Sequence, residues 1–437
     1  MQRGTRAARA AVTVIPPKPR SAGACFLRAV AATGWRIAPT ASAPTTIEPT
    51  TIGRMLHTFA VSNYRSLRDL TLALTPLTVV TGANGCGKSN LYRALRLLAQ
   101  AADGRLAEAL ALEGGIPSVQ WAGPHDIRQQ AKRGGPIQGT AKKAPLRVTF
   151  GFAADDVAYE IALGLPTPSL SRFAFDPEIK HEVVWQQPPR RPSNTWLERD
   201  GFDVRARGAD GKWVRLAFAP ARNQSLLAEL GEPERFPELF ALRERLRAWR
   251  FYDGFRTDVE SPLRQPRVSV QTGALAHDGR DLAAALQTIL EIGDGPALQA
   301  AIEDAFPGSV LEILDAGDAR LQVGLRVEGL LRPLSAAELS DGTLRYLCLL
   351  AALMSPRPPE LLVLNEPEQS LHPDLLHPLA RQVVAAAKRS QVWLISHARA
   401  LVDAIEDAGG TPSIELARDY GETRVVGQGL LDAPAWP

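Results

Sequence analysis

The stretch LTVVTGANGCGKSN, residues 77–90, decides the fold. Its first six residues are apolar or β-branched apart from the closing glycine, which predicts a short buried strand. The segment that follows the stretch, LYRALRLLAQAA, has the apolar spacing of a helix. Between strand and helix, Gly82, Gly87, Lys88 and Ser89 fit the pattern GxxxxGK[ST] without a gap. This order of strand, glycine-rich turn and helix is the context that a phosphate-binding loop requires.

The chemistry of such a loop explains its residue types. Glycines let backbone N–H groups converge on phosphate oxygens, and the helix N-terminus adds the positive end of its dipole. Lys88 is expected to reach the β- and γ-phosphates, and Ser89 to ligate Mg²⁺. We therefore expect a nucleotide site whose binding residues in this loop are Gly82, Asn84, Gly85, Gly87, Lys88, Ser89 and Asn90.

A second group of motifs lies in the C-terminal third of the chain. LSDGT, residues 339–343, opens an apolar helix that runs to about residue 354. The strand LLVLNE, residues 361–366, then leads into PEQSLHP and a helix that ends near Arg389. A further strand, QVWLIS, is followed directly by His397. Polar residues thus follow two buried strands at the point where each strand ends.

Together these motifs resemble the ABC-type ATPases, and within them the RecF/SMC/OLD-like branch that includes bacterial RecF-like AAA family ATPases. GANGCGKS resembles the Walker A motif, LSDGT the signature motif, LLVLNEPE the Walker B motif, SLHP the D-loop and LISHA the switch-histidine strand. FAVSNYRSLRDL resembles the opening strands of that branch, and WRFYDGFRTD is also similar. The resemblance spans residues 55 to about 405, and its order and spacing are more specific than any single motif.

The resemblance implies an α/β fold: a P-loop NTPase head of the ABC type with a central parallel sheet, an N-terminal antiparallel β region and an inserted lobe of strands and helices. Short alternating runs over residues 145–216 independently predict antiparallel strands. Helices are expected over most of residues 225–250 and over 281–292. The expected divisions of the head 55–437 are a Walker A half 55–125, an inserted lobe of about 126–305, and a signature and Walker B half of about 306–437.

The resemblance also assigns roles to single residues. Glu366 would act as the general base that polarises the attacking water, and His397 would sense the γ-phosphate. Arg65, in NYRSL, is expected as an additional phosphate contact, and Gln120 is the candidate for the Q-loop glutamine. These roles make ATP and Mg²⁺ the expected ligands.

The signature motif implies a second copy of the chain. Ser340, Asp341 and Gly342 would contact the γ-phosphate of ATP bound to the other subunit, so ATP would join two heads. Their place at a helix N-terminus suits an anion, because free N–H groups and the helix dipole face it. We therefore expect an ATP-dependent homodimer.

Asn365 departs from the usual Walker B motif. Most P-loop enzymes carry an aspartate here, which helps to hold Mg²⁺. An amide oxygen can still accept a hydrogen bond from a metal-bound water, but it lacks the negative charge. We expect Ser89 and Asn365 to serve the metal, with weaker Mg²⁺ binding and slow hydrolysis as the result.

Composition bounds the protein class. The 437 residues are 45% hydrophobic and 22% charged, as in a soluble globular protein of one large domain or two. No apolar run approaches the roughly 18 residues of a membrane span. Cys25, Cys86 and Cys348 form no CxxC pair, which argues against a disulfide framework or zinc site and indicates a reducing cytoplasm. Residues 1–54 are rich in Ala, Arg, Pro and Thr and predict a disordered extension, with Met55 beginning the folded protein.

Two classes of function remain open from the sequence. The first is an ATP-gated dimerising clamp in DNA repair or maintenance, and the second an ATPase of a phage-defence or toxin–antitoxin system; a regulatory ATP switch is a weaker third. An ABC transporter subunit is disfavoured because the Walker A and signature motifs are too far apart, and no pathway partner protein can be named. DNA binding has one local support, an acid-free stretch at 127–154, which an exposed solvated insertion explains equally well. Its basic residues are Arg128, Lys132, Arg133, Lys142, Lys143 and Arg147.

Overall fold

The structure, a computed structural model, describes residues 54–123, 147–166, 172–173, 175–187, 189–216, 220–429, 434 and 436. All of them belong to the unit Pro49–Pro437. Residues 1–53 of the expected extension lie outside the described residues. So does most of the acid-free stretch, of which only residues 147–154 are described.

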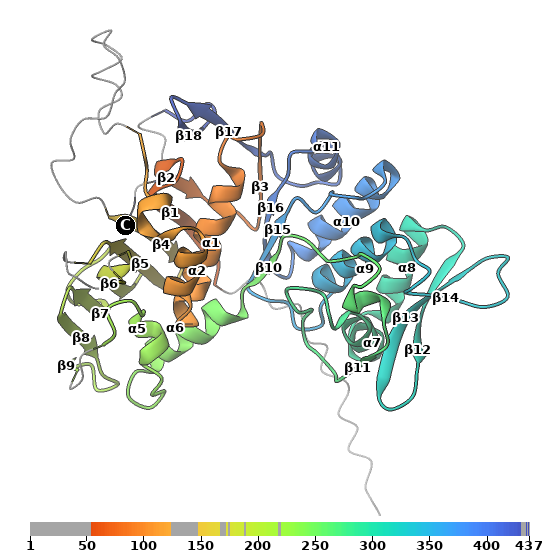
Figure 1. Cartoon of the computed structure of the whole chain (residues 1–437), viewed down its shortest axis with the longest axis horizontal. Coiled ribbons are helices and arrows are strands. Elements are labelled where there is room, and N and C mark those ends of the chain that lie inside the picture. The colour runs from red at the N-terminus through yellow and green to blue at the C-terminus, as the bar shows by residue number, and fades with distance from the viewer. Residues whose placement is uncertain are drawn as a thin grey trace, which may run out of the picture. The chain divides into compact units, whose positions relative to one another are not determined.

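The sheet that carries the nucleotide motifs is parallel over five of its six strands. Its order is β10, β15, β16, β3, β17, β18, and only β17 and β18 pair antiparallel (Figure 1). The mixed α/β class is therefore confirmed. The strands are β3 (Leu77–Gly82), β10 (Arg250–Tyr252), β15 (Leu361–Asn365), β16 (Gln391–Ile395), β17 (Ile414–Asp419) and β18 (Glu422–Val425).

Both faces of this sheet are buried, which explains why its central strands read as unbroken apolar runs. In β15, Leu361 and Val363 belong to one hydrophobic core, and Leu362 and Leu364 belong to a second core. Alternate side chains of a strand point to opposite faces, so the two cores lie on opposite sides of the sheet.

Helices contribute to both cores. The first core holds α1 (Lys88–Ala102), α2 (Leu106–Leu112), α3 (Gly115–Val119), α5 (Leu226–Glu229) and α6 (Pro237–Ala248). The second holds α7 (Leu282–Ile292), α8 (Gly295–Ala305), α9 (Asp341–Leu353), α10 (Leu376–Ala386) and α11 (Arg399–Asp407). Of two short 3₁₀ turns, η1 (Pro262–Arg264) lies between β10 and α7, and η2 (Pro373–Leu375) leads directly into α10.

An eight-stranded antiparallel sheet backs the first core. In this sheet β1 lies between β2 and β4, so the N-terminal strands and the strands of residues 145–216 form one continuous sheet. Its strands, in sheet order, are β2 (Leu67–Ala73), β1 (Leu56–Tyr64), β4 (Val148–Ala154), β5 (Val157–Gly164), β6 (Glu178–Gln186), β7 (Thr195–Asp200), β8 (Asp203–Arg207) and β9 (Trp213–Arg215). A smaller sheet is built from β11 (Arg267–Val268), β12 (Ser309–Asp315), β13 (Arg320–Val327) and β14 (Leu334–Ser335).

The helical segment expected over residues 225–250 is interrupted. The helix α5 ends at Glu229, and α6 begins only at Pro237. The intervening GEPERF carries Gly231 and Pro233, which disfavour a continuing helix, whereas Pro237 suits the first position of the next one.

Across the described ranges, no helix combines the length and the apolar character that crossing a membrane would need.

Candidate nucleotide site

The phosphate-binding loop lies between β3 and α1 and depends on glycine at both of its ends. Gly82 and Gly87 have φ angles of +146° and +113°, which L side chains rarely adopt. A Cβ on Gly82 would lie 2.3 Å from the carbonyl oxygen of Leu416, and one on Gly87 would lie 2.1 Å from Thr423 Oγ1. Chain segments more than 330 residues away in sequence therefore press directly on this loop.

Lys88 lies at the first position of α1, where the dipole and the free N–H groups of the helix are closest. The residue is only 4% exposed, and its Nζ donates hydrogen bonds to the carbonyls of Gly82, at 2.5 Å, and Ala83, at 3.1 Å. The ammonium is thus held over the loop that precedes it. Asn84, Gly85 and Ser89 are exposed on the same loop and helix start.

A hydrogen-bonded network of hydroxyl groups, called the brace below, supports the phosphate loop. Thr423, on β18, donates from Oγ1 to the carbonyl of Cys86 at 2.7 Å and lies 2.7 Å from Ser66 Oγ. Asn90 donates from Nδ2 to the same Ser66 hydroxyl at 2.9 Å. Asn90, expected among the nucleotide contacts, thus has its side-chain amide turned to this brace. Ser66 and Thr423 were not anticipated from the sequence.

The Walker A, Walker B and switch-histidine segments end at one edge of the parallel sheet. Asn365 pairs in register with Ile395, and Ile395 pairs with Val80. The residues that follow these positions therefore meet at the carboxyl edge. In open α/β sheets, ligands bind outside the carboxyl ends of the strands.

Ser89 and Asn365 line one pocket of about 370 Å³, together with Glu113 and Asp253. The Oδ1 atom of Asn365 is buried and has no hydrogen-bond partner in the part of the chain that the structure describes. A buried amide oxygen without a partner calls for a ligand or a water. Hydroxyl and amide oxygens are hard ligands of the kind that Mg²⁺ accepts, usually through water. The residues present thus fit the expected Mg²⁺.

Glu366 has a strained backbone, with φ at +49°. Its N–H donates to the carbonyl of Ile395 at 2.7 Å, and its Oε2 accepts a hydrogen bond from the side chain of Gln369. The Nδ1 atom of His397 lies 3.6 Å from Glu366 Oε1. The two residues expected to be catalytic are therefore neighbours, although they are 31 positions apart in the sequence.

Arg65 is turned toward an acid. Its guanidinium pairs with Glu113 at 2.8 Å, and the Tyr64 hydroxyl donates to the same carboxylate at 2.6 Å. Partial burial lowers the pKa of Arg65, but the hydrogen bonds with Glu113 and Tyr64 outweigh it and raise the pKa overall. Glu113 also lines the pocket of Ser89, and the role of Arg65 as a phosphate contact stays a prediction. Gln120 forms a backbone bridge to Tyr64, and its Q-loop role stays a prediction.

Ser340 caps the signature helix. It is the N-cap of α9, and its Oγ accepts a hydrogen bond from the N–H of Thr343 at 3.1 Å. Arg264, a residue that sequence reasoning missed, donates to the carbonyls of Ala336, Ala337 and Leu339 at 2.8–3.2 Å and pairs with the Asp341 carboxylate at 2.5 Å. The Asp341 carboxylate at the start of α9 is thus paired with a cation.

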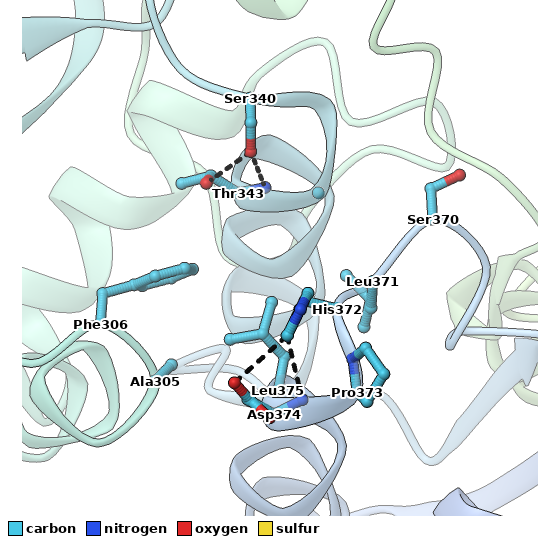
Figure 2. Close-up of a pocket in the computed structure, with 11 residues that line it drawn as sticks. Ala305, Phe306, Ser340, Thr343, Ser370, Leu371, His372, Pro373, Asp374 and Leu375 are labelled. Carbon is cyan, nitrogen blue, oxygen red and sulfur yellow. Dashed lines mark hydrogen bonds and ion pairs between the residues drawn. The ribbon is translucent and has the colours of Figure 1, made fainter.

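Figure 2 shows the pocket that the signature motif faces, with Ser340 and Thr343 at the start of α9 and the segment 370–375 beside the helix. The pocket measures about 600 Å³. Gly342 is required where the helix meets this segment, because a Cβ there would lie 2.8 Å from the carbonyl oxygen of Ser370. Within the described ranges, no residue of the loop 82–90 lines this pocket. The signature motif and Ser89 therefore line separate pockets of one chain.

Comparison with solved structures finds similarity to SMC heads. An SMC head bound to the C-terminal winged-helix domain of ScpA is 12% identical, with a TM-score of 0.47, and 86% of this chain and 98% of that chain are covered. The SMC head domain from Thermotoga maritima is 15% identical (TM-score 0.43; 86% and 99% covered). The Smc head from Pyrococcus furiosus, with an extended coiled coil and bound to the C-terminal domain of ScpA, is 13% identical (TM-score 0.43; 87% and 98% covered). No curated protein matches significantly.

A family model does match, and it covers residues 77–403, about three quarters of the chain. The match begins at the first residue of β3 and extends into α11, so it contains the phosphate loop, the signature motif, Asn365, Glu366 and His397. The chain belongs to the family described as "AAA domain, putative AbiEii toxin, Type IV TA system".

Proposed function

We propose that the chain binds ATP and Mg²⁺ at the carboxyl edge of β3, β15 and β16, and hydrolyses the nucleotide slowly. The observation that carries this proposal is the meeting of three motifs at that edge. The phosphate loop ends β3, Asn365 ends β15 beside it, and Glu366 lies 3.6 Å from His397. Membership of the AAA domain family supports the same reading.

Each residue then has a physical task. Lys88 and the loop N–H groups bind the phosphates, and Ser89 with Asn365 would hold Mg²⁺, which when bound neutralises charge on the phosphate oxygens. Glu366 accepts a proton from the attacking water, and His397 contacts the γ-phosphate. Hydrolysis is slow because the amide of Asn365 offers the metal no negative charge.

ATP joins two copies of the chain in this proposal. Ser340, Asp341 and Gly342 of one copy approach the γ-phosphate held by the other. The separate pockets of Ser89 and of the signature motif support such an arrangement, since each subunit offers half of two composite sites. The exposed start of α9 supplies free N–H groups and the positive end of a helix dipole for that phosphate.

The proposal is tested by ATP turnover in the purified protein. Lys88→Ala should abolish ATP binding, whereas Glu366→Gln should keep binding and lose turnover. Lys212→Ala is a matched control, because Lys212 is an exposed lysine whose contact with Asp210 is 3.8 Å long. If the wild-type protein shows no turnover at saturating ATP and Mg²⁺, the proposed ATP hydrolysis is refuted. If Lys88→Ala and wild type turn over ATP equally, the proposed phosphate site is refuted.

Two biological settings are proposed for the enzyme. The family description names a toxin of a toxin–antitoxin system, which favours the defence or toxin–antitoxin setting. The DNA-maintenance setting rests on the acid-free stretch 127–154, of which only residues 147–154 are described.

The two settings predict different results. If the ATPase is part of a toxin, regulated expression of the wild type should arrest growth of a bacterial host, and Lys88→Ala should not. If it is a DNA clamp, single- or double-stranded DNA should stimulate turnover and the stimulation should fall steeply with salt. If Lys88→Ala also arrests growth, the proposal of an ATP-dependent toxin is contradicted. If DNA leaves the turnover rate unchanged, the proposal of a DNA clamp is contradicted.

A further inference from the structure

Glu368 is a buried acid that the proposed mechanism does not use. It follows Glu366 by two positions and is only 8% exposed. The left-handed backbone of Glu366 turns the chain there, and Pro367 beside it is buried as well. Carboxylates are rarely this buried unless they are paired or hydrogen-bonded, so the position calls for a reason.

One oxygen of Glu368 accepts hydrogen bonds from all three residues of the switch loop, residues 396–398, which follows β16. Its Oε1 accepts hydrogen bonds from the Ser396 hydroxyl at 2.6 Å and from the backbone N–H groups of His397 and Ala398 at 3.1 and 3.2 Å. Three consecutive residues after β16 are thus fixed by a single atom. Hydrogen bonds to a charged acceptor are stronger than those to a neutral one, so the loop is held firmly.

The hydrogen bonds that start at Glu368 continue to β3, the strand that leads into the phosphate loop. Ser396 is fully buried, and its N–H donates to the carbonyl of Val80 in β3 at 3.0 Å. Glu368 therefore connects the segment after Walker B, the switch loop and the strand that leads into Gly82. A displacement of any one of these three segments would therefore displace the other two.

The same oxygen also faces the histidine ring. His397 Nδ1 lies 3.3 Å from Glu368 Oε1 and 3.6 Å from Glu366 Oε1. With Nδ1 directed at the two carboxylates, Nε2 is the ring nitrogen left to meet a γ-phosphate. The second oxygen of Glu368, Oε2, is buried without a hydrogen-bond partner among the described residues. A buried oxygen of this kind calls for a hydrogen-bond donor such as a water.

We propose that Glu368 is a positioning residue for ATP hydrolysis: it sets the loop and ring of His397 and does not itself touch the nucleotide. The inference rests on the proposed function, because it assigns His397 to the γ-phosphate. It predicts that loss of the Glu368 charge slows turnover through His397 and spares ATP binding, which depends on Lys88 and the loop amides.

The test is a double-mutant cycle in the full chain. Glu368→Gln should lower kcat about tenfold or more and leave KM for ATP within about twofold. In a His397→Ala background, the same substitution should change kcat less than about twofold, since the residue that it positions is gone. Ser396→Ala removes one donor and keeps the carboxylate, so it should give a smaller loss that also disappears in the His397→Ala background.

A control separates positioning from stability. Glu360 immediately precedes β15, and its side chain pairs with Arg245. Glu360→Gln should lower the thermal midpoint but leave kcat of the folded protein unchanged. Equal losses of kcat for Glu368→Gln with and without His397 would overturn the inference, as would unchanged kcat in both Glu368→Gln and Ser396→Ala. A wild type that does not turn over ATP would instead refute the proposed function, and the inference would fall with it.

Discussion

Asn365 stands where most phosphate-loop enzymes carry an aspartate. It ends β15, lines the pocket of Ser89 and keeps a buried oxygen without a partner among the described residues. An aspartate would add a negative charge at the same point. The difference between the two side chains is one amide group, so exchanging them isolates the role of charge in metal binding.

Asn365→Asp should lower the Mg²⁺ concentration that gives half-maximal turnover, because a carboxylate attracts the cation that an amide only accommodates. A tenfold shift would correspond to about 1.4 kcal/mol. The measurement is turnover against Mg²⁺ at saturating ATP, with ATP affinity in the presence of a chelator as the control. Superimposable Mg²⁺ curves would show that residue 365 does not serve the metal.

A second prediction compares two glycines of the phosphate loop that share a positive φ angle but differ in the space around an added Cβ. Gly85 and Gly87 both have positive φ angles, +78° and +113°, but an added Cβ meets no atom within 4 Å at Gly85. Gly85→Ala should therefore cost about 1–2 kcal/mol of backbone strain alone. Gly87→Ala should cost more, because its Cβ also clashes with Thr423.

Thermal midpoints and ATP affinity of both variants check this expectation. Thr423→Ala should recover part of the loss in Gly87→Ala, since it removes the clashing hydroxyl, and none of the loss in Gly85→Ala. If Gly85→Ala proves as damaging as Gly87→Ala, contact with Thr423 is not what requires glycine at position 87.

At the scale of elements, β6 carries a buried acid remote from the nucleotide motifs. Glu182 is fully buried and accepts hydrogen bonds from the Tyr159 and Ser225 hydroxyls and from the N–H of Leu226. Burial raises the pKa of this carboxyl above its ordinary 4.5, although the hydrogen bonds and nearby Arg199 oppose the rise. The antiparallel sheet therefore contains a group whose protonation is linked to folding.

The sign of this linkage gives a third prediction. A raised pKa means that the folded state binds the proton more tightly, so the stabilisation is present below pH 4.5 and is lost as pH rises through the folded pKa. Glu182→Gln cannot ionise. The thermal midpoint of Glu182→Gln minus that of wild type should therefore increase between pH 5 and pH 8.

The exposed Glu328 provides the comparison for this pH series. Glu328→Gln should show a difference from wild type that does not follow the same trend. A difference for Glu182→Gln that is flat or falls with pH would mean that burial does not raise the pKa of Glu182.

For the whole molecule, the separate pockets lead to a prediction about assembly. Glu366→Gln should bind ATP without consuming it and should therefore accumulate a head-to-tail dimer. Light scattering at micromolar protein, with and without ATP and Mg²⁺, measures the mass. Ser340→Arg should place a bulky cation at the start of α9, spare ATP binding and prevent the dimer. A Glu366→Gln protein that remains monomeric with ATP would contradict this assembly, and so would a Ser340→Arg protein with normal turnover.

The sequence by itself determined the local parts of this protein. Residues 77–102 predict strand, loop and helix because hydrophobic spacing and glycine placement act over neighbouring positions, and the structure has β3 and α1 there. The buried runs at 361–365 and 391–395 likewise predict β15 and β16. The interruption at Gly231 and Pro233 could have been read from the same local rules, because both residues disfavour a helix.

Only the tertiary structure decided how distant segments meet. Pairing of β1 with β4 joins the opening strands to a sheet formed some 85 residues later, and no local pattern selects that partner over other alternating strands. Thr423 against Gly87, Arg264 against Asp341 and Glu368 against Ser396 are contacts of the same kind. In each, the sequence offers many residues as possible partners. The choice is made by the packing of the two cores, which brings one particular pair within reach. Where the pair is also buried, as with Glu368 and Ser396, the two side chains must satisfy each other's hydrogen bonds.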